Sequence, residues 1–291
     1  MTRCSVLVGL ALACVLLSPC LALADSAGKL YEKGTALLSQ GEFDGAYEAF
    51  RQAAKADPEN QEYRQQTALV RQVIKVRKRL GEEKDAQKWG KMANALRTFY
   101  HDNQVYGEAL KIDREAHDRM GTGESAANLA ETQLLAGKNA EAVELVSGLS
   151  PEIAIPRALA YLGIALARQG EIDRAKEIAG TLKIPVKAAA GLLFDCACLH
   201  ALVGDKSGAA KLLTRCFEQT PPSRLDGAKL YAKQCEDLSS MVAGLEFAEA
   251  LKTQSKVKES KCSGGTSCGK CPSKSSCSTD KKTSSSTKGK K

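Results

Sequence analysis

Four cysteines close to the C-terminus have the types and spacing that could do chemistry. They are separated by five, two and five residues: Cys262, Cys268, Cys271 and Cys277. Lys270, between the closest two, would favour the thiolate, which is the reactive and metal-binding form. Four thiolates could hold tetrahedral Zn²⁺ or soft Cu⁺, whereas an oxidising compartment would favour two disulfides. The spacing therefore leaves open a metal or thiol-exchange site, two disulfides, or no fixed role.

The sequence around these thiols contains nothing that would pack around a site. From residue 258 to 291 the chain is mainly Ser, Lys, Gly, Thr and Cys, with no large apolar residue after Val257. Such a segment cannot bury enough surface to offset its chain entropy, which predicts a disordered tail over residues 258–291. We therefore expect no cofactor, with zinc or copper on the tail cysteines as the alternative.

The positive charge of the chain is concentrated in the same region. Residues 251–291 contain 11 lysines against Glu259 and Asp280, and the whole chain carries +8, so the body is slightly acidic. A lysine-rich tail attracts polyanions in a salt-dependent way, which suggests an anionic envelope polymer or lipid headgroups as partners. Because the tail lacks arginine and aromatic residues, we expect no sequence-specific nucleic-acid binding.

Four more cysteines lie in helix-forming sequence, namely Cys196, Cys198, Cys216 and Cys235. Free cysteine is among the most buried residue types, so these are predicted to be small core residues. A bridge from Cys196 or Cys198 to Cys216, across one pair of helices, is the alternative.

No catalytic constellation is visible in the sequence. The chain has only three histidines, and it contains no H-E-x-x-H, G-x-S-x-G, P-loop or dinucleotide-binding glycine pattern. His200 follows Cys196 by one helical turn, and we interpret it as a core or groove histidine beside a core cysteine. The prediction is that the protein is not an enzyme.

Turn residues recur along the chain at an interval close to 34 residues. The gaps between successive members are 62, 34, 33 and 34 residues, for Gly41, Asn103, Gly137, Gly170 and Gly204. A period of this length built from two short amphipathic helices predicts a helical solenoid, in which each helix pair buries its apolar face against the next.

The first repeat, residues 28–60, shows the pattern most clearly. Small and apolar residues stand at fixed offsets in it: Leu30, Gly34, Leu37, Gly41, Phe43, Ala46, Phe50, Ala53 and Pro58. The segment resembles a tetratricopeptide repeat. Gly34 and Ala46 would let the two helices approach closely, and Gly41 would supply a turn with positive φ. Weaker repeats follow in phase up to Pro222, after an irregular unit that begins with a long helix at residues 62–80.

The resemblance implies an all-α fold: a right-handed solenoid of antiparallel helix pairs, with a C-terminal capping helix and a disordered tail. The predicted divisions are a signal peptide at 1–24, the solenoid at 25–222, a capping helical segment at 223–257 and the tail at 258–291. Within residues 223–257, apolar residues recur at helical spacing: Tyr231, Cys235, Leu238, Met241 and Leu245.

The N-terminus reads as a secretory signal. Arg3 supplies the positive start, residues 6–17 the apolar centre, and Ala22-Leu23-Ala24 a small-residue cleavage site. Retention of this segment as a membrane anchor is the alternative. The prediction is an exported protein, in a bacterial periplasm or outside the cell.

The repeats therefore predict a non-enzymatic scaffold that binds a protein or peptide in its concave groove. The alternative is a metal-handling or thiol-exchange protein that acts through the tail cysteines. First helices of the pairs would line the groove, and the candidates chosen from helix phase are Tyr31, Thr35, Leu38, Arg97, Tyr100, Glu131, Arg157, Ile164 and Arg168. Some tetratricopeptide proteins clamp a terminal carboxylate with lysine and asparagine, a set that is absent from the first repeat here.

Overall fold

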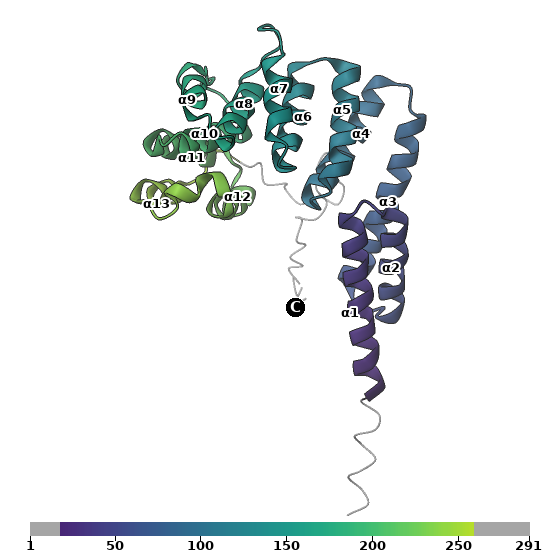
Figure 1. Ribbon diagram of the computed structural model, residues 1–291. Helices are drawn as coiled ribbons and strands as arrows, with labels where there is room; N and C mark the ends of the chain where they lie inside the picture. The colour runs from purple at the N-terminus through teal and green to yellow at the C-terminus, as the bar shows by residue number, and fades with distance from the viewer. Residues whose placement is uncertain (1–17, 259–291) are drawn as a thin grey trace, which may run out of the picture.

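The computed structural model describes residues 18–258, and every regular element in this range is a helix. The helices form an arch, with α1 and α2 at one end and α12 and α13 at the other (Figure 1). In chain order they are α1 (Ser18–Ser39), α2 (Phe43–Ala56), α3 (Gln61–Glu82), α4 (Ala86–Asp102), α5 (Tyr106–Met120), α6 (Gly123–Leu135), α7 (Asn139–Ser147), α8 (Pro156–Arg168), α9 (Ile172–Thr181), α10 (Ala190–Leu202), α11 (Lys206–Gln219), α12 (Pro222–Gln234), the 3₁₀ helix η1 (Glu236–Met241) and α13 (Leu245–Leu251).

Consecutive helices pair as the repeat predicts. The pairs are α1 with α2, α4 with α5, α6 with α7, α8 with α9 and α10 with α11, while α3 stands between two pairs as the predicted long helix. The first helices α6, α8 and α10 also pack side by side along the arch. The prediction of an all-helical, tetratricopeptide-like solenoid is confirmed.

The turns inside the pairs confirm the glycine pattern with one correction. Gly41, Gly137, Gly170 and Gly204 have φ between +73° and +89°, a region that L-residues rarely adopt and glycine enters without strain. In the α4–α5 turn, however, the left-handed residue is Gln104, with φ +57°, and not Asn103. Asn103 instead caps α4, where its side-chain amide donates to the carbonyl oxygen of Phe99 at 2.8 Å.

The first pair packs closely because its contact residues are small. A Cβ placed on Gly34 would lie 2.7 Å from two carbons of the Phe50 ring, closer than packed atoms approach. Phe43, Ala46 and Phe50 of α2 are almost fully buried. The predicted close approach at Gly34 and Ala46 is therefore confirmed.

We expect the Gly34→Ala substitution to lower the free energy of unfolding by about 1–2 kcal/mol, because the added methyl group overpacks the contact with Phe50. Gly28→Ala is the matched control: it lies in the same helix, and its Cβ would meet nothing within 4 Å. There the better helix propensity of alanine should leave stability unchanged or raise it by up to about 1 kcal/mol. Urea denaturation of both variants checks the pair, and equal stabilities would contradict the packing argument.

Buried apolar side chains form two clusters along the arch. One includes residues of α1 to α5, with Phe50, Trp89 and Tyr100 among its largest members. The other includes residues of α6 to α13, with Leu166, Leu199 and Phe217 among them. Helices α5 and α6 pack together where the two clusters meet. The arch thus has two apolar cores and a junction between them.

The C-terminal segment differs from the predicted single capping helix. It is broken at Cys235 and again before Leu245, giving α12, η1 and α13. Leu238 and Met241 are buried as predicted, but Tyr231 and Leu245 are 56% and 86% exposed. Helical spacing failed here because η1 packs against α10 and α13 against α11, so each short piece buries its own residues. We call residues 222–251 the capping segment.

Two predicted regions fall largely or wholly outside the described residues. Most of the predicted signal peptide precedes Ser18, although α1 runs through the predicted cleavage point between Ala24 and Asp25. The four tail cysteines lie beyond residue 258. Within residues 18–258, no helix is both long enough and apolar enough to span a bilayer.

Candidate functional site

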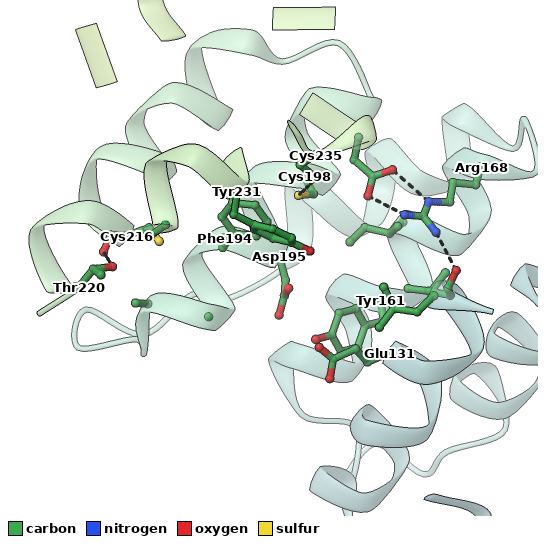
Figure 2. Close-up of a pocket in the computed structure, with 17 residues that line it drawn as sticks. Glu131, Tyr161, Arg168, Phe194, Asp195, Cys198, Cys216, Thr220, Tyr231 and Cys235 are labelled. Carbon is green, nitrogen blue, oxygen red and sulfur yellow. Dashed lines mark hydrogen bonds and ion pairs between the residues drawn. The ribbon is translucent and has the colours of Figure 1, made fainter. Parts of the chain in front are cut away.

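A cavity of about 340 Å³ lies where α6, α8 and α10 meet the capping segment (Figure 2). We call it the α10 pocket. Its apolar walls include Ile164 from α8 and the rings of Phe194 and Tyr231, whose centroids are 5.2 Å apart. The two rings come from α10 and α12, so the pocket depends on how the capping segment sits on the last repeat. A hollow with rings on one side suits an apolar or long aliphatic side chain.

An ion pair closes one side of the α10 pocket. Arg168, at the end of α8, donates from Nε to Oδ1 of Asp237 at 3.0 Å and from Nη2 to Oδ2 at 2.9 Å. Its Nη1 also donates to the carbonyl oxygen of Leu134 at 3.1 Å. Such a bidentate pair fixes both side chains. Arg168 therefore joins the solenoid to the capping segment, and its charge is balanced by Asp237.

Asp195 contributes a carboxylate without a close cationic partner. The nearest basic group is Nε of Arg157, at 3.9 Å. Burial raises the pKa of Asp195 to about 7, and the nearby carboxylate of Glu131 adds to the rise while Arg157 opposes it. The pocket therefore contains a group that exchanges its proton near neutral pH, where a bound cation would hold it ionised.

Two thiols meet in the wall of the α10 pocket. Sγ of Cys198 on α10 lies 3.7 Å from Sγ of Cys235 at the α12–η1 break. Their hydrogen bond lowers the pKa of Cys235, and the same bond, with burial, raises that of Cys198. The sequence-based alternative paired Cys196 or Cys198 with Cys216. The structure places Cys235 beside Cys198 instead, because the capping segment folds back onto α10.

The same thiols lie near the carboxylate of Asp237, and the three groups together resemble a set of metal ligands. Cys198, Cys235 and Asp237 offer three ligand atoms within 4.8 Å of one another. Both oxygens of Asp237 already accept hydrogen bonds from Arg168, and the guanidinium charge would repel a cation there. The donor set is therefore a poor fit for a metal ion.

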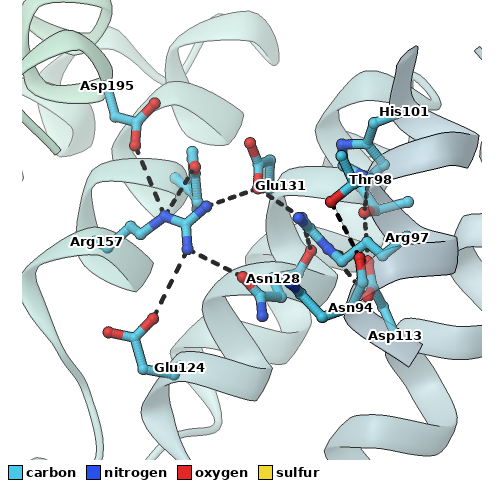
Figure 3. A network of polar contacts seen from close by, with 12 residues as sticks. Asn94, Arg97, Thr98, His101, Asp113, Glu124, Asn128, Glu131, Arg157 and Asp195 are labelled. Carbon is cyan, nitrogen blue, oxygen red and sulfur yellow. Dashed lines mark hydrogen bonds and ion pairs between the residues drawn. The ribbon is translucent and has the colours of Figure 1, made fainter. Parts of the chain in front are cut away.

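A polar network lies at the junction of the two apolar cores (Figure 3). Glu131 on α6 is at its centre and accepts, through Oε2, from Nη2 of Arg97 at 2.5 Å and from Nη2 of Arg157 at 2.7 Å. Arg97 on α4 also pairs with Asp113 on α5 at 3.1 Å. Arg157 on α8 donates to Oδ1 of Asn128 at 2.9 Å. The network thus connects α4, α5, α6 and α8, and Glu131 also lines the α10 pocket.

His101 belongs to the inner part of this network. Its Nε2 lies 2.7 Å from Oγ1 of Thr132, and that hydroxyl donates to Oδ2 of Asp113 at 2.5 Å. The hydroxyl therefore accepts from Nε2–H of a neutral imidazole. Burial, with the charge of Arg97, lowers the pKa of His101 to about 4. His101 is thus a neutral structural donor.

The nine residues predicted to bind a partner fall into different surroundings. Leu38, Tyr100 and Ile164 are almost fully buried, at 4%, 1% and 3% exposed. Leu38 and Tyr100 belong to the apolar core of α1 to α5, whereas Ile164 lines the α10 pocket. At the first pair, Thr35 is exposed, and the Tyr31 hydroxyl donates to Oε1 of Glu62 at 2.8 Å. Five of the nine group together, with Arg97, Glu131 and Arg157 in the network and Glu131, Ile164 and Arg168 around the α10 pocket.

Helix phase missed the residues that α10 and the capping segment contribute to the pocket. Phe194, Asp195, Cys198, Tyr231 and Cys235 all line it. One signal was present: Asp195 is the only charged residue of α10, an otherwise apolar helix apart from His200. A lone acid in such a helix indicates a buried polar site. Nothing in the sequence indicated that the break at Cys235 brings the capping segment to this place.

Comparison with protein families gives a match at the N-terminal helix pair. Residues 27–60, which include α2 and the part of α1 that packs on it, match the family model of the tetratricopeptide repeat. A search of curated proteins found no match to the chain. Tetratricopeptide repeats generally mediate protein–protein interaction. The matched pair is followed by further helix pairs stacked in the same arch, so residues 27–60 form a tetratricopeptide-like repeat at the start of a longer helical solenoid.

Proposed function

We propose that this protein is an exported, non-enzymatic scaffold that binds a peptide segment of a partner protein in the α10 pocket. The observation that carries the proposal is the pocket itself: a cavity of about 340 Å³ with two rings on its wall and the carboxylate of Asp195 among its lining groups. Protein binding is the general role of the repeat family. Export is inferred from the N-terminal sequence of residues 1–24.

The charges around the pocket favour a ligand with a basic side chain. Arg168 is neutralised by Asp237, and Arg157 by Glu131. The carboxylate of Asp195 remains, with its closest cation 3.9 Å away. A lysine or arginine side chain would lay its methylene groups along Phe194 and Tyr231 and bring its charge to Asp195. We therefore expect an extended peptide segment anchored by one basic residue.

Peptide selection tests this proposal without knowledge of the natural partner. Random peptides displayed on phage should be enriched for sequences with a lysine or arginine, and a selected peptide should bind the purified full chain. We expect Tyr231→Ala to weaken that binding at least tenfold, because a packed ring is removed from the pocket wall. Fluorescence polarisation with the labelled peptide measures the change.

Leu230→Ala is the matched control for this test. Leu230 is adjacent to Tyr231, and both are 56% exposed, but only Tyr231 lines the pocket. The control should therefore bind like the native chain. Selection of no peptide, or equal loss of binding in the two variants, would contradict the proposed site. Charge reversal at Arg157 or Arg168 would be a poor test, because both arginines hold helices together.

A further inference from the structure

We propose that Cys198 and Cys235 form a disulfide that joins α10 to the capping segment when the protein meets a disulfide oxidant. The two sulfurs are already 3.7 Å apart, and among the cysteines of residues 26–258 no other pair of sulfurs is in such contact. A disulfide needs a sulfur–sulfur distance of about 2.05 Å. The inference concerns the redox state of the chain and does not depend on the proposed ligand.

The backbone around the pair allows the sulfurs to approach. Cys198 is in the middle of α10, which is held by packing against α8 and α11. Cys235 is at the break between α12 and η1, with φ −68° and ψ 121°, outside either helix. A small movement of this break, with rotation about the Cα–Cβ bonds, brings the sulfurs together without unwinding a helix. The Cys198–Cys235 pair is therefore placed to form a disulfide reversibly.

The differences between the two thiols set the order of the reaction. Cys235 is the more exposed of the two, and the hydrogen bond from Cys198 stabilises its thiolate. In the first step the Cys235 thiolate attacks a disulfide such as oxidised glutathione, forms a mixed disulfide and releases one glutathione thiolate. Cys198 then loses its proton and attacks Cys235 Sγ, which releases the second glutathione. Two protein thiols are oxidised, and one glutathione disulfide is reduced to two thiols.

Formation of this disulfide would fix the shape of the α10 pocket. Part of its lining comes from α10, with Phe194, Asp195 and Cys198, and part from the capping segment, with Tyr231, Cys235 and Asp237. In the reduced protein, η1 packs on α10, and the Arg168–Asp237 pair links the capping segment to α8. The disulfide adds a covalent link between α10 and the capping segment, so oxidation would restrict movement of Tyr231 relative to Phe194.

Disulfide mapping by mass spectrometry tests the proposal on the full chain. The folded protein is equilibrated with oxidised glutathione, free thiols are alkylated, and the chain is cleaved with trypsin. We expect the peptide of residues 188–206 to be linked to the peptide of residues 234–252, and to be released by a reductant. Because the first peptide contains both Cys196 and Cys198, the Cys196→Ser variant is analysed in parallel.

Retention of the link in Cys196→Ser, and its loss in Cys198→Ser, would support the assignment. Alkylation of both Cys198 and Cys235 in the oxidised, folded chain would overturn it, as would a link from either residue to Cys216 or to a tail cysteine. Protection of both thiols by added Zn²⁺ in place of a link would also overturn it, in favour of a metal site. Circular dichroism confirms that each variant is folded before its thiols are mapped.

Discussion

Replacing Glu131 by glutamine is expected to lower the free energy of unfolding by about 3 kcal/mol at pH 7. The carboxylate lies between the guanidiniums of Arg97 and Arg157, at 2.5 and 2.7 Å, and its loss leaves two like charges facing each other. Breaking a buried ion pair costs about 3–5 kcal/mol, and the lower end applies because the Glu131 side chain is 26% exposed. Urea denaturation of the native chain and the variant measures the difference.

The effect of Glu131→Gln should depend on pH in a defined direction. Burial alone would raise the pKa of Glu131, but Arg97 and Arg157 bring it below its usual value. A depressed pKa in the folded state stabilises the protein above the pKa of the unfolded chain, and this contribution is lost as the pH falls through the folded value. The two proteins should therefore become more similar in stability below about pH 4.

Glu124→Gln is the matched control. Glu124 is on the same helix and also faces Arg157, at 3.7 Å, but its side chain is 71% exposed. An exposed pair of this kind contributes about 0–1 kcal/mol, so the control should stay close to the native chain. If both substitutions had equally small effects, the network would not stabilise the junction of the two cores.

The repeat architecture was predictable from the sequence because each of its determinants is local. Gly41 and its equivalents had to adopt positive φ, and small residues such as Gly34 had to stand where helices touch. The exception at Gln104 has the same character: the α4–α5 turn has three residues like the other turns, and its left-handed position is again the middle one, which is the residue after Asn103. Spacing located the turn but could not show which residue in it would take the strained conformation.

The site was less predictable because it is built from residues far apart in the chain. Arg168 pairs with Asp237, and Cys198 meets Cys235, through a segment whose breaks follow no helical period. Selection by helical periodicity also assigned the charged residues on the first helices of the pairs to the binding groove. Arg97, Glu131 and Arg157 satisfy one another instead, which a single sequence cannot show.

Glu131 belongs both to the polar network at the junction of the two cores and to the lining of the α10 pocket. It holds α4 and α8 through Arg97 and Arg157, and it also lines the α10 pocket. Burial makes the largest contribution to the raised pKa of Asp195, and the negative charge of Glu131 makes the second. The network that stabilises the arch therefore also influences the protonation of Asp195 in the pocket. A substitution at Glu131 is expected to lower the pKa of Asp195 as well as the stability of the arch.

The Asp195→Asn substitution is expected to stabilise the protein at pH 8, by about 2–3 kcal/mol. Burial, with Glu131, raises the pKa of Asp195 from 3.8 to about 7. At pH 8 the folded protein must therefore keep an ionised group that its surroundings disfavour. Three pKa units correspond to about 4 kcal/mol, and the expected gain is smaller because the side chain is 19% exposed to water. Asparagine has a similar shape and no charge, so it removes this cost.

The sign of the pH dependence separates this explanation from a change in packing. The unfolded chain loses the Asp195 proton near pH 4 and the folded chain near pH 7, so folding is increasingly penalised as the pH rises between these values. The advantage of Asp195→Asn over the native chain should therefore be largest at pH 8, shrink toward pH 5 and vanish near pH 4. Thermal unfolding of both proteins across this range measures it. Asp226→Asn, at an exposed position on α12, should give no such trend. A constant difference at every pH would show that the surroundings of Asp195 do not disfavour its ionised form. It would also remove the electrostatic reason for expecting a basic ligand.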